Sequence, residues 1–192
     1  GILLLSQSKY SDSYDFLKKL DGLEKSHFNF SIKYIYTLIN SGNFNQAYSF
    51  SKKMDREKRG SFETDLIIGI NYLKNLKHDL AKEQFLKAKK RKITSVLNNY
   101  IAETLYNWSD LKGNNLENAL LNLNQLDPRF ENLKKIQNVF LHCYFDNKDT
   151  KFLYSNLTSN EKTDFSRYNY FYARYLGNQG EKNKAKKLLK IF

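Results

Sequence analysis

Few residues in this sequence have types suited to chemistry, and their spacing does not assemble a reactive site. His142 and Cys143 are adjacent, so on a helix their side chains point about 100° apart and cannot pair as base and nucleophile. Cys143 is the single cysteine, which excludes an internal disulfide, and no Cys/His spacing suits a metal ion. The sequence contains no glycine-rich phosphate loop and no G-x-S-x-G motif. We therefore expect no catalytic activity, no cofactor and no metal site.

The composition is that of a folded protein built from helices. Hydrophobic residues make up 41% and charged residues 27% of the 192 residues, which argues against disorder. One proline and eight glycines favour long helices with short turns. No apolar run is long enough to span a membrane. We expect a cytoplasmic protein; because the chain lacks an initiator Met, a periplasmic or secreted location after signal removal stays open.

The net charge of +12 admits two interpretations. It could serve an anionic partner, or it could reflect AT-rich codon usage, which enriches Lys together with Asn, Ile, Phe and Tyr. The second interpretation is favoured because the lysines are spread along the chain. Three basic runs fall on expected second helices or their ends, where cations also suit the helix dipole: Lys52-Lys53 with Arg56 and Lys58-Arg59; Lys87 with Lys89, Lys90, Arg91 and Lys92; and Lys182 to Lys190.

The elements that would position any site come from a repeated helix pair, best formed over residues 64–90. One position near the start of the second helix recurs at spacings of 34, 34, 38, 34 and 32 residues. It is occupied by a small residue in every pair except one, where it is Leu: Ser13, Ala47, Ala81, Ala119, Leu153 and Ala185. First helices are expected over 30–41, 65–76, 96–112, 134–145 and 165–179, with apolar residues at helical spacing. Turns follow at Gly42, Gly113 and Gly180. The pattern predicts an all-α protein.

The sequence resembles the tetratricopeptide repeat family. The small and large residues of the best unit match that family's pattern, and a second set matches with larger closing residues: Ile68, Gly69, Tyr72, Ala81, Phe85 and Ala88, then Tyr172, Ala173, Leu176, Ala185, Leu189 and Phe192. The resemblance implies a right-handed α-α superhelix of about five to six helix pairs. It also implies one domain over 1–192. Because both chain ends are apolar, we expect a segment of a longer array or end-to-end self-association.

The resemblance implies a concave groove lined by the first helices, which would bind a partner protein's peptide or helix. The expected groove positions are aromatic, amide or cationic in the main: Tyr36, Asn40, Leu66, Ile70, Lys74, Trp108, Lys112, His142, Tyr170, Arg174 and Asn178. A branch of the family binds acidic C-terminal peptides through Lys, Asn and Arg, but Ile32, Tyr36 and Ile67 stand at the matching positions. That binding mode is therefore not expected.

The predicted function is a non-catalytic protein-interaction scaffold. The alternative is a basic helical-repeat protein that binds nucleic acid or another polyanion. Helical-repeat readers of RNA repeat the same polar residues at equivalent positions, and this chain does not, which disfavours the alternative. A third possibility is a spacer segment within a larger assembly.

Overall fold

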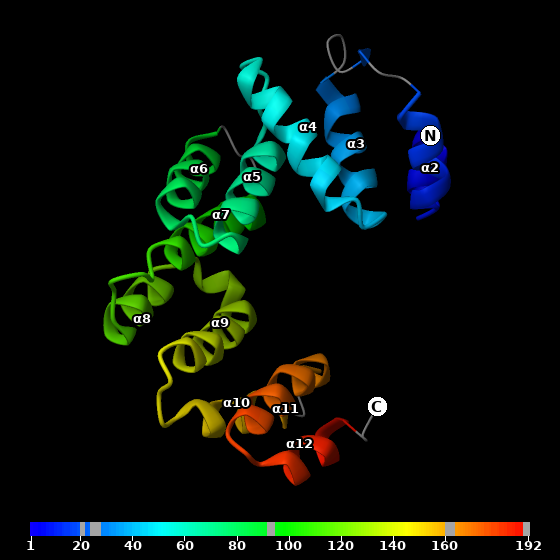
Figure 1. The fold of residues 1–192 in the computed structure, drawn as a ribbon. Coiled ribbons are helices and arrows are strands. Elements are labelled where there is room, and N and C mark those ends of the chain that lie inside the picture. Colours follow the sequence, from blue (N-terminus) through cyan, green and yellow to red (C-terminus); the bar gives the residue numbers. More distant parts are fainter. Residues whose placement is uncertain (20–21, 24–27, 92–94, 160–163, 190–192) are drawn as a thin grey trace. The chain divides into compact units, whose positions relative to one another are not determined.

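The computed structural model describes residues 1–19, 22–23, 28–91, 95–159 and 164–189, and these residues are all-α, as predicted (Figure 1). The chain divides into two compact units, Gly1–Lys112 and Gly113–Phe192, which are treated separately below. Of the residues singled out from the sequence, Lys92, Lys190 and Phe192 lie outside the described part.

Each helix contacts the next one along the chain within its unit. The first unit contains α1 (Ile2–Ser6), α2 (Tyr10–Leu17), α3 (Phe28–Asn40), α4 (Phe44–Arg56), α5 (Phe62–Lys74), α6 (His78–Lys90) and α7 (Val96–Ser109). The second unit contains α8 (Leu116–Asn124), η2 (Pro128–Phe130), α9 (Glu131–Tyr144), α10 (Thr150–Thr158), η3 (Ser166–Tyr168), α11 (Asn169–Asn178) and α12 (Lys182–Leu189). Sequential packing of this kind is that of an all-α helical repeat. Among the described helices, none is long and apolar enough to cross a membrane.

Local capping chemistry decides where the predicted first helices begin and end. α5 begins at Phe62 rather than residue 65, because Ser61 caps it: the Ser61 Oγ accepts from the Thr64 N–H at 3.3 Å, and the Thr64 Oγ1 accepts from the Ser61 N–H at 2.7 Å. α7 begins at Val96 as predicted but ends at Ser109, so the predicted end at residue 112 was wrong. The predicted start at residue 165 was also wrong, because η3 precedes α11.

A left-handed residue closes each first helix and recurs with the period of the repeat. Apart from Gly22 and Lys58, the described residues with positive φ lie after first helices, at spacings of 34, 34, 37, 33 and 34 residues: Ser8, Gly42, Leu76, Gly113, Asp146 and Gly180. After Gly42, the Asn43 N–H donates to the Leu38 carbonyl at 2.8 Å, and the matching bond forms after each of the others except Gly113. This bond, from the sixth residue of the turn to the carbonyl of the first, belongs to the Schellman motif that ends helices. The backbone therefore shows the repeat independently of side-chain identity.

The second helices bury the small residue predicted near their start, with one exception. Ser13, Ala47, Ala81, Ala119 and Ala185 are all buried. In α10 the prediction of Leu153 was wrong: Leu153 is only half-buried, and Thr150 takes the buried position, followed by Tyr154 and Leu157 at the spacings of four and three seen in α6. Thr150 is tolerated there because its hydroxyl donates to the Asn147 carbonyl at 2.6 Å.

Two helices of the first unit approach each other closely at Gly69, as the pattern of small residues predicted. A Cβ added to Gly69 of α5 would lie 2.4 Å from the Cε1 atom of Phe85 in α6. Phe85 is fully buried, and Ala81 and Ala88 on either side of it are fully buried too. Gly69 therefore makes room for the Phe85 ring, which fills the interface between the two helices.

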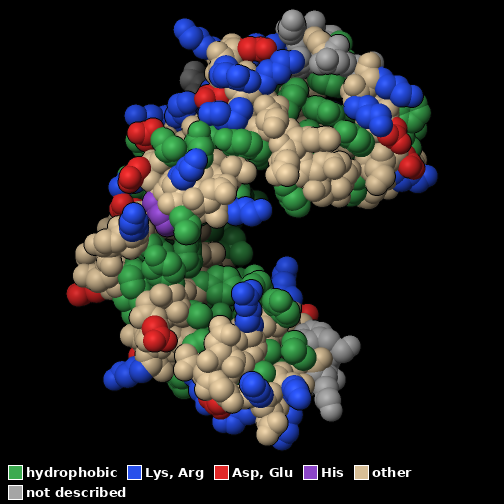
Figure 2. All heavy atoms as spheres, viewed as in Figure 1, with side chains coloured by type: hydrophobic (Ala, Val, Ile, Leu, Met, Phe, Trp, Pro, Cys, Tyr) green, Lys and Arg blue, Asp and Glu red, His purple; other side chains and the backbone are tan. Residues whose placement is uncertain are grey.

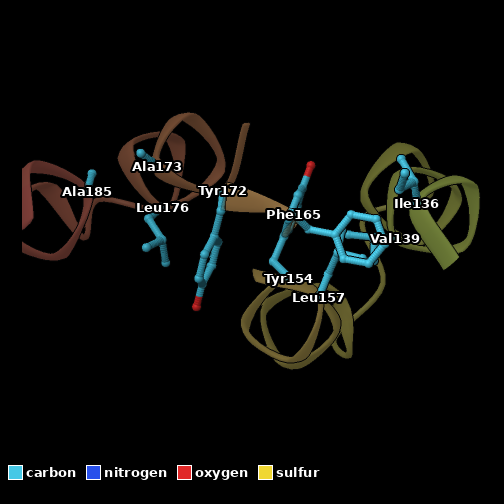
Figure 3. Packing of buried hydrophobic residues seen from close by; sticks show 9 residues of the cluster. All are labelled: Ile136, Val139, Tyr154, Leu157, Phe165, Tyr172, Ala173, Leu176 and Ala185. Carbon is cyan, nitrogen blue, oxygen red and sulfur yellow. The ribbon is translucent and has the colours of Figure 1, made fainter. Parts of the chain in front are cut away.

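The second unit has an aromatic core (Figure 3). The Tyr154 ring of α10 stacks on the Tyr172 ring of α11 with centroids 5.3 Å apart and an interplanar angle of 8°. On α9, Phe140 packs edge-on against Tyr154 at 6.4 Å, which joins three successive helices through rings. The remaining buried members of the cluster are Ile136, Val139, Leu157, Phe165, Ala173, Leu176 and Ala185.

Candidate functional site

In the first unit, the predicted groove residues lie on helices that are neighbours in space. α3 contacts α5, and α5 contacts α7, so the first helices lie side by side in addition to packing on the helices between them. Tyr36 of α3 and Ile70 of α5 are separated by one repeat, and their side chains are 59% and 47% exposed. Large apolar side chains at equivalent, exposed positions of two neighbouring helices form a candidate contact surface.

Polar groups stand one helical turn beyond each of these apolar side chains. Asn40 follows Tyr36, and Lys74 follows Ile70; both polar side chains are exposed. The Asn40 Nδ2 donates to the Tyr36 carbonyl at 2.8 Å, which holds the amide at the end of α3 with its oxygen available as an acceptor. We define Tyr36, Asn40, Ile70 and Lys74 as the first-helix face. Binding sites commonly combine apolar side chains with a few polar groups in this way.

The other predicted positions of the first unit are less exposed or lie off the helices. Leu66 and Trp108 are half-buried, on α5 and α7. Lys112 is exposed but lies in the turn after α7, because that helix ends at Ser109. Trp108 makes further interactions within the protein. These three residues therefore add less accessible surface than the first-helix face.

In the second unit, the four predicted positions fall on α9 and α11. Tyr170 is 57% exposed on α11, and Arg174 and Asn178 follow on the same helix at intervals of four residues, both exposed. His142 of α9 is half-buried, and its Nδ1 lies 2.9 Å from the Asn138 carbonyl oxygen. Tyr170, Arg174 and Asn178 thus form one exposed stripe along α11, to which His142 contributes little.

The Cys143 thiol and the His142 imidazole have surroundings that do not favour reactivity. Cys143 is half-buried, and this burial raises the pKa of its thiol, which keeps the reactive thiolate scarce. The neighbouring His142 ring faces a backbone carbonyl. Among the described residues, no group of three or more His, Cys, Asp or Glu side chains is arranged to hold a metal ion.

The structure also brings together two basic runs that sequence reasoning treated separately. Lys58, from the run that follows α4, and Lys87, Lys90 and Arg91, from the run on α6, line one hollow of about 460 Å³ with Asp55 and Gly60. A signal for this meeting was present in the sequence: Asp55 and Lys87 are 32 residues apart, close to one repeat, and equivalent positions of successive repeats lie near each other.

No protein-family model matches this sequence, and a search of curated proteins finds no match either.

Proposed function

We propose that this chain is a non-catalytic interaction scaffold of tetratricopeptide-like repeats, in which the first-helix face binds a peptide or helix of a partner protein. The observation that carries the proposal is the pair of exposed apolar side chains, Tyr36 and Ile70, one repeat apart on neighbouring helices. The recurring Schellman turns and the small buried residues of the second helices are features of a helical repeat, and the resemblance to that family rests on the sequence pattern.

The energetics favour occupation of this face by apolar side chains. Full burial of an Ile side chain gains roughly 1.5–3 kcal/mol, so covering Ile70, which is 47% exposed, would gain about half of that. Tyr36 offers a flat ring with a hydroxyl, the kind of residue enriched at binding hot spots. The Asn40 amide and the Lys74 ammonium can bond to the backbone carbonyls or carboxylates of a peptide. A short amphipathic or extended segment with two apolar anchors fits this arrangement.

The experiment selects peptides from a random display library on the wild-type protein and measures their Kd values for two double variants. Tyr36→Ala with Ile70→Ala removes the apolar part of the first-helix face. Phe44→Ala with Leu80→Ala is the matched control, because Phe44 and Leu80 are 60% and 43% exposed on the second helices α4 and α6. The control removes similar apolar surface from other faces of the same unit.

We expect the Tyr36/Ile70 variant to weaken binding of the selected peptides by about tenfold or more, while the Phe44/Leu80 variant binds as the wild type does. Peptides that bind both variants equally well would place the interaction elsewhere, and the proposal would then be wrong. Circular dichroism of each variant confirms that the helices are retained.

A further inference from the structure

The hollow between the ends of α4 and α6 gathers positive charge, and Lys and Arg side chains crowd over these two helices in the space-filling view (Figure 2). Lys58, Lys87, Lys90 and Arg91 line it, against the single carboxylate of Asp55. Like charges repel one another when they are brought together, so such a cluster is stabilised by a bound anion. The hollow takes its lining from α4, α6 and the turn after α4, and thus differs from the first-helix face.

Two of the four cations are already neutralised. The Lys87 Nζ lies 3.1 Å from the Asp55 Oδ1 and 3.4 Å from its Oδ2. The Arg91 Nε donates to the Asp65 Oδ2 at 2.8 Å, and Asp65 is fully buried. In the part of the chain that the structure describes, Lys58 and Lys90 form no ion pair. These two ammonium groups therefore supply the uncompensated charge of the hollow.

Arg91 is held in place before any ligand arrives. Asp65 accepts from Arg91 on one side and from the Gln84 Nε2 at 3.1 Å on the other, so the buried carboxylate is fully engaged. A Cβ at Gly60 would lie 2.9 Å from the Arg91 Nη2, so glycine leaves the space that the guanidinium occupies. The planar guanidinium has N–H groups beyond those given to Asp65, and these remain for a phosphate oxygen. Fixed donors bind an anion at a lower entropic cost than mobile ones.

The helix dipole explains only part of this arrangement. A cation in the last turn of a helix is stabilised by the helix dipole, which is a sufficient reason for Lys87 and Lys90 to lie near the end of α6. It does not explain why Lys58, which lies beyond the end of α4 with a φ of 57°, lines the same hollow.

We propose that this hollow binds a compact ligand carrying two or more phosphate groups. Its volume of about 460 Å³ falls within the usual range for small-molecule sites, roughly 300–1,000 Å³. Lys58, Lys90 and Arg91 provide the ligand's direct contacts.

The test titrates the protein with inorganic tripolyphosphate, a nucleoside triphosphate and a single-stranded RNA oligonucleotide, using isothermal titration calorimetry. Lys58→Gln with Lys90→Gln removes the two unpaired charges and leaves the Arg91–Asp65 pair intact. Lys9→Gln with Lys77→Gln is the charge-matched control, because both lysines are exposed in the same unit and lie outside the hollow. A measurement on the unmodified chain complements the variants: tripolyphosphate should slow acetylation of Lys58 and Lys90 and leave Lys77 unaffected.

We expect tripolyphosphate to bind the wild type and the control alike, and the Lys58/Lys90 variant about tenfold more weakly or worse. Equal affinity for tripolyphosphate and the nucleoside triphosphate would show that phosphate alone is recognised, and a higher affinity for the nucleotide would assign it as the ligand; both support the proposal. Binding of RNA without binding of tripolyphosphate, or an equal loss in both variants, would overturn it. The peptide-binding variants of the first-helix face keep these residues, so either proposal can fail alone.

Discussion

The contact between Gly69 and Phe85 predicts that the mildest possible side-chain addition destabilises the first unit. In Gly69→Ala the new methyl group would lie 2.4, 2.7 and 2.9 Å from three atoms of the Phe85 ring. The ring is fully buried and cannot move into solvent. Overpacking of a core costs about 1–3 kcal/mol, and three short distances place this site near the upper end. Ala gains about 1 kcal/mol over Gly in a helix, so we expect a net loss of about 2 kcal/mol.

The same substitution at Gly177 provides the control. Gly177 also lies within a helix, α11, but a Cβ there would meet nothing within 4 Å. Gly177→Ala should therefore stabilise its helix, by up to about 1 kcal/mol, through propensity alone. One chemical change is thus expected to act with opposite signs at two helical glycines.

Urea unfolding followed by tryptophan fluorescence measures the effect on the first unit, because Trp108, the single tryptophan, lies in α7. Hydrogen exchange of the α11 amides reports Gly177→Ala. Adding Phe85→Leu to Gly69→Ala should recover part of the loss, since the two positions are in contact and couple. A Gly69→Ala protein as stable as the wild type would refute the packing argument.

Three further predictions concern caps, charge and turns. Ser61→Ala removes the acceptor for the Thr64 N–H and should cost about 1 kcal/mol in the urea unfolding of the first unit; an unchanged midpoint would contradict the assigned cap. A hydrogen bond from Lys151 lowers the pKa of the Glu181 carboxyl, so this pair stabilises the fold above the pKa of an unfolded glutamate and ceases to do so as the pH falls through the lower folded value. Lys151→Met should accordingly lower Tm at neutral pH and leave it unchanged in strong acid, as thermal scans across pH would show. Leu76→Gly places glycine at a φ of 58° and should raise the free energy of unfolding by about 0.5–1 kcal/mol. A lower free energy of unfolding in urea would contradict the assignment of a strained turn.

The all-α class and the period of the repeat were predictable because both follow from the spacing of apolar and small residues along the chain. A helix that packs on its neighbours must bury the same face in every repeat, so small residues such as Ala47 and Ala81 return at a fixed distance. The glycine at position 42 predicts a residue in the left-handed conformation, and Gly42 has a positive φ. Leu76 and Asp146 take the same conformation without a glycine, so no residue type predicted it there. At both turns a local Schellman hydrogen bond closes the helix, from the Lys77 N–H to the Tyr72 carbonyl and from the Asn147 N–H to the His142 carbonyl.

The incorrect prediction of Leu153 as the buried residue of α10 also reflects a local hydrogen bond. Leu153 lies 34 residues beyond Ala119, so the spacing favoured it for the buried position, but Thr150 occupies that position. The choice depends on the start of α10 and on a hydrogen bond from the Thr150 hydroxyl to the Asn147 carbonyl. A polar side chain whose hydrogen bond is made locally can be buried at small cost, and hydropathy does not record that bond.

The sequence by itself therefore determined that the chain is helical, how the helices repeat, and that Gly69 lies where two of them meet closely, but not where each helix begins and ends. Only the tertiary structure decided which charged residues meet. Asp65 reads as an ordinary helical acid, yet it is fully buried and holds Arg91 from 26 residues away, and Lys58 joins Lys90 in one hollow. Hydrophobic burial leaves a periodic trace in every repeat because all repeats share the same packing. A charged site is formed once, from side chains that become neighbours only after the helices have stacked, and a single occurrence leaves no period to detect.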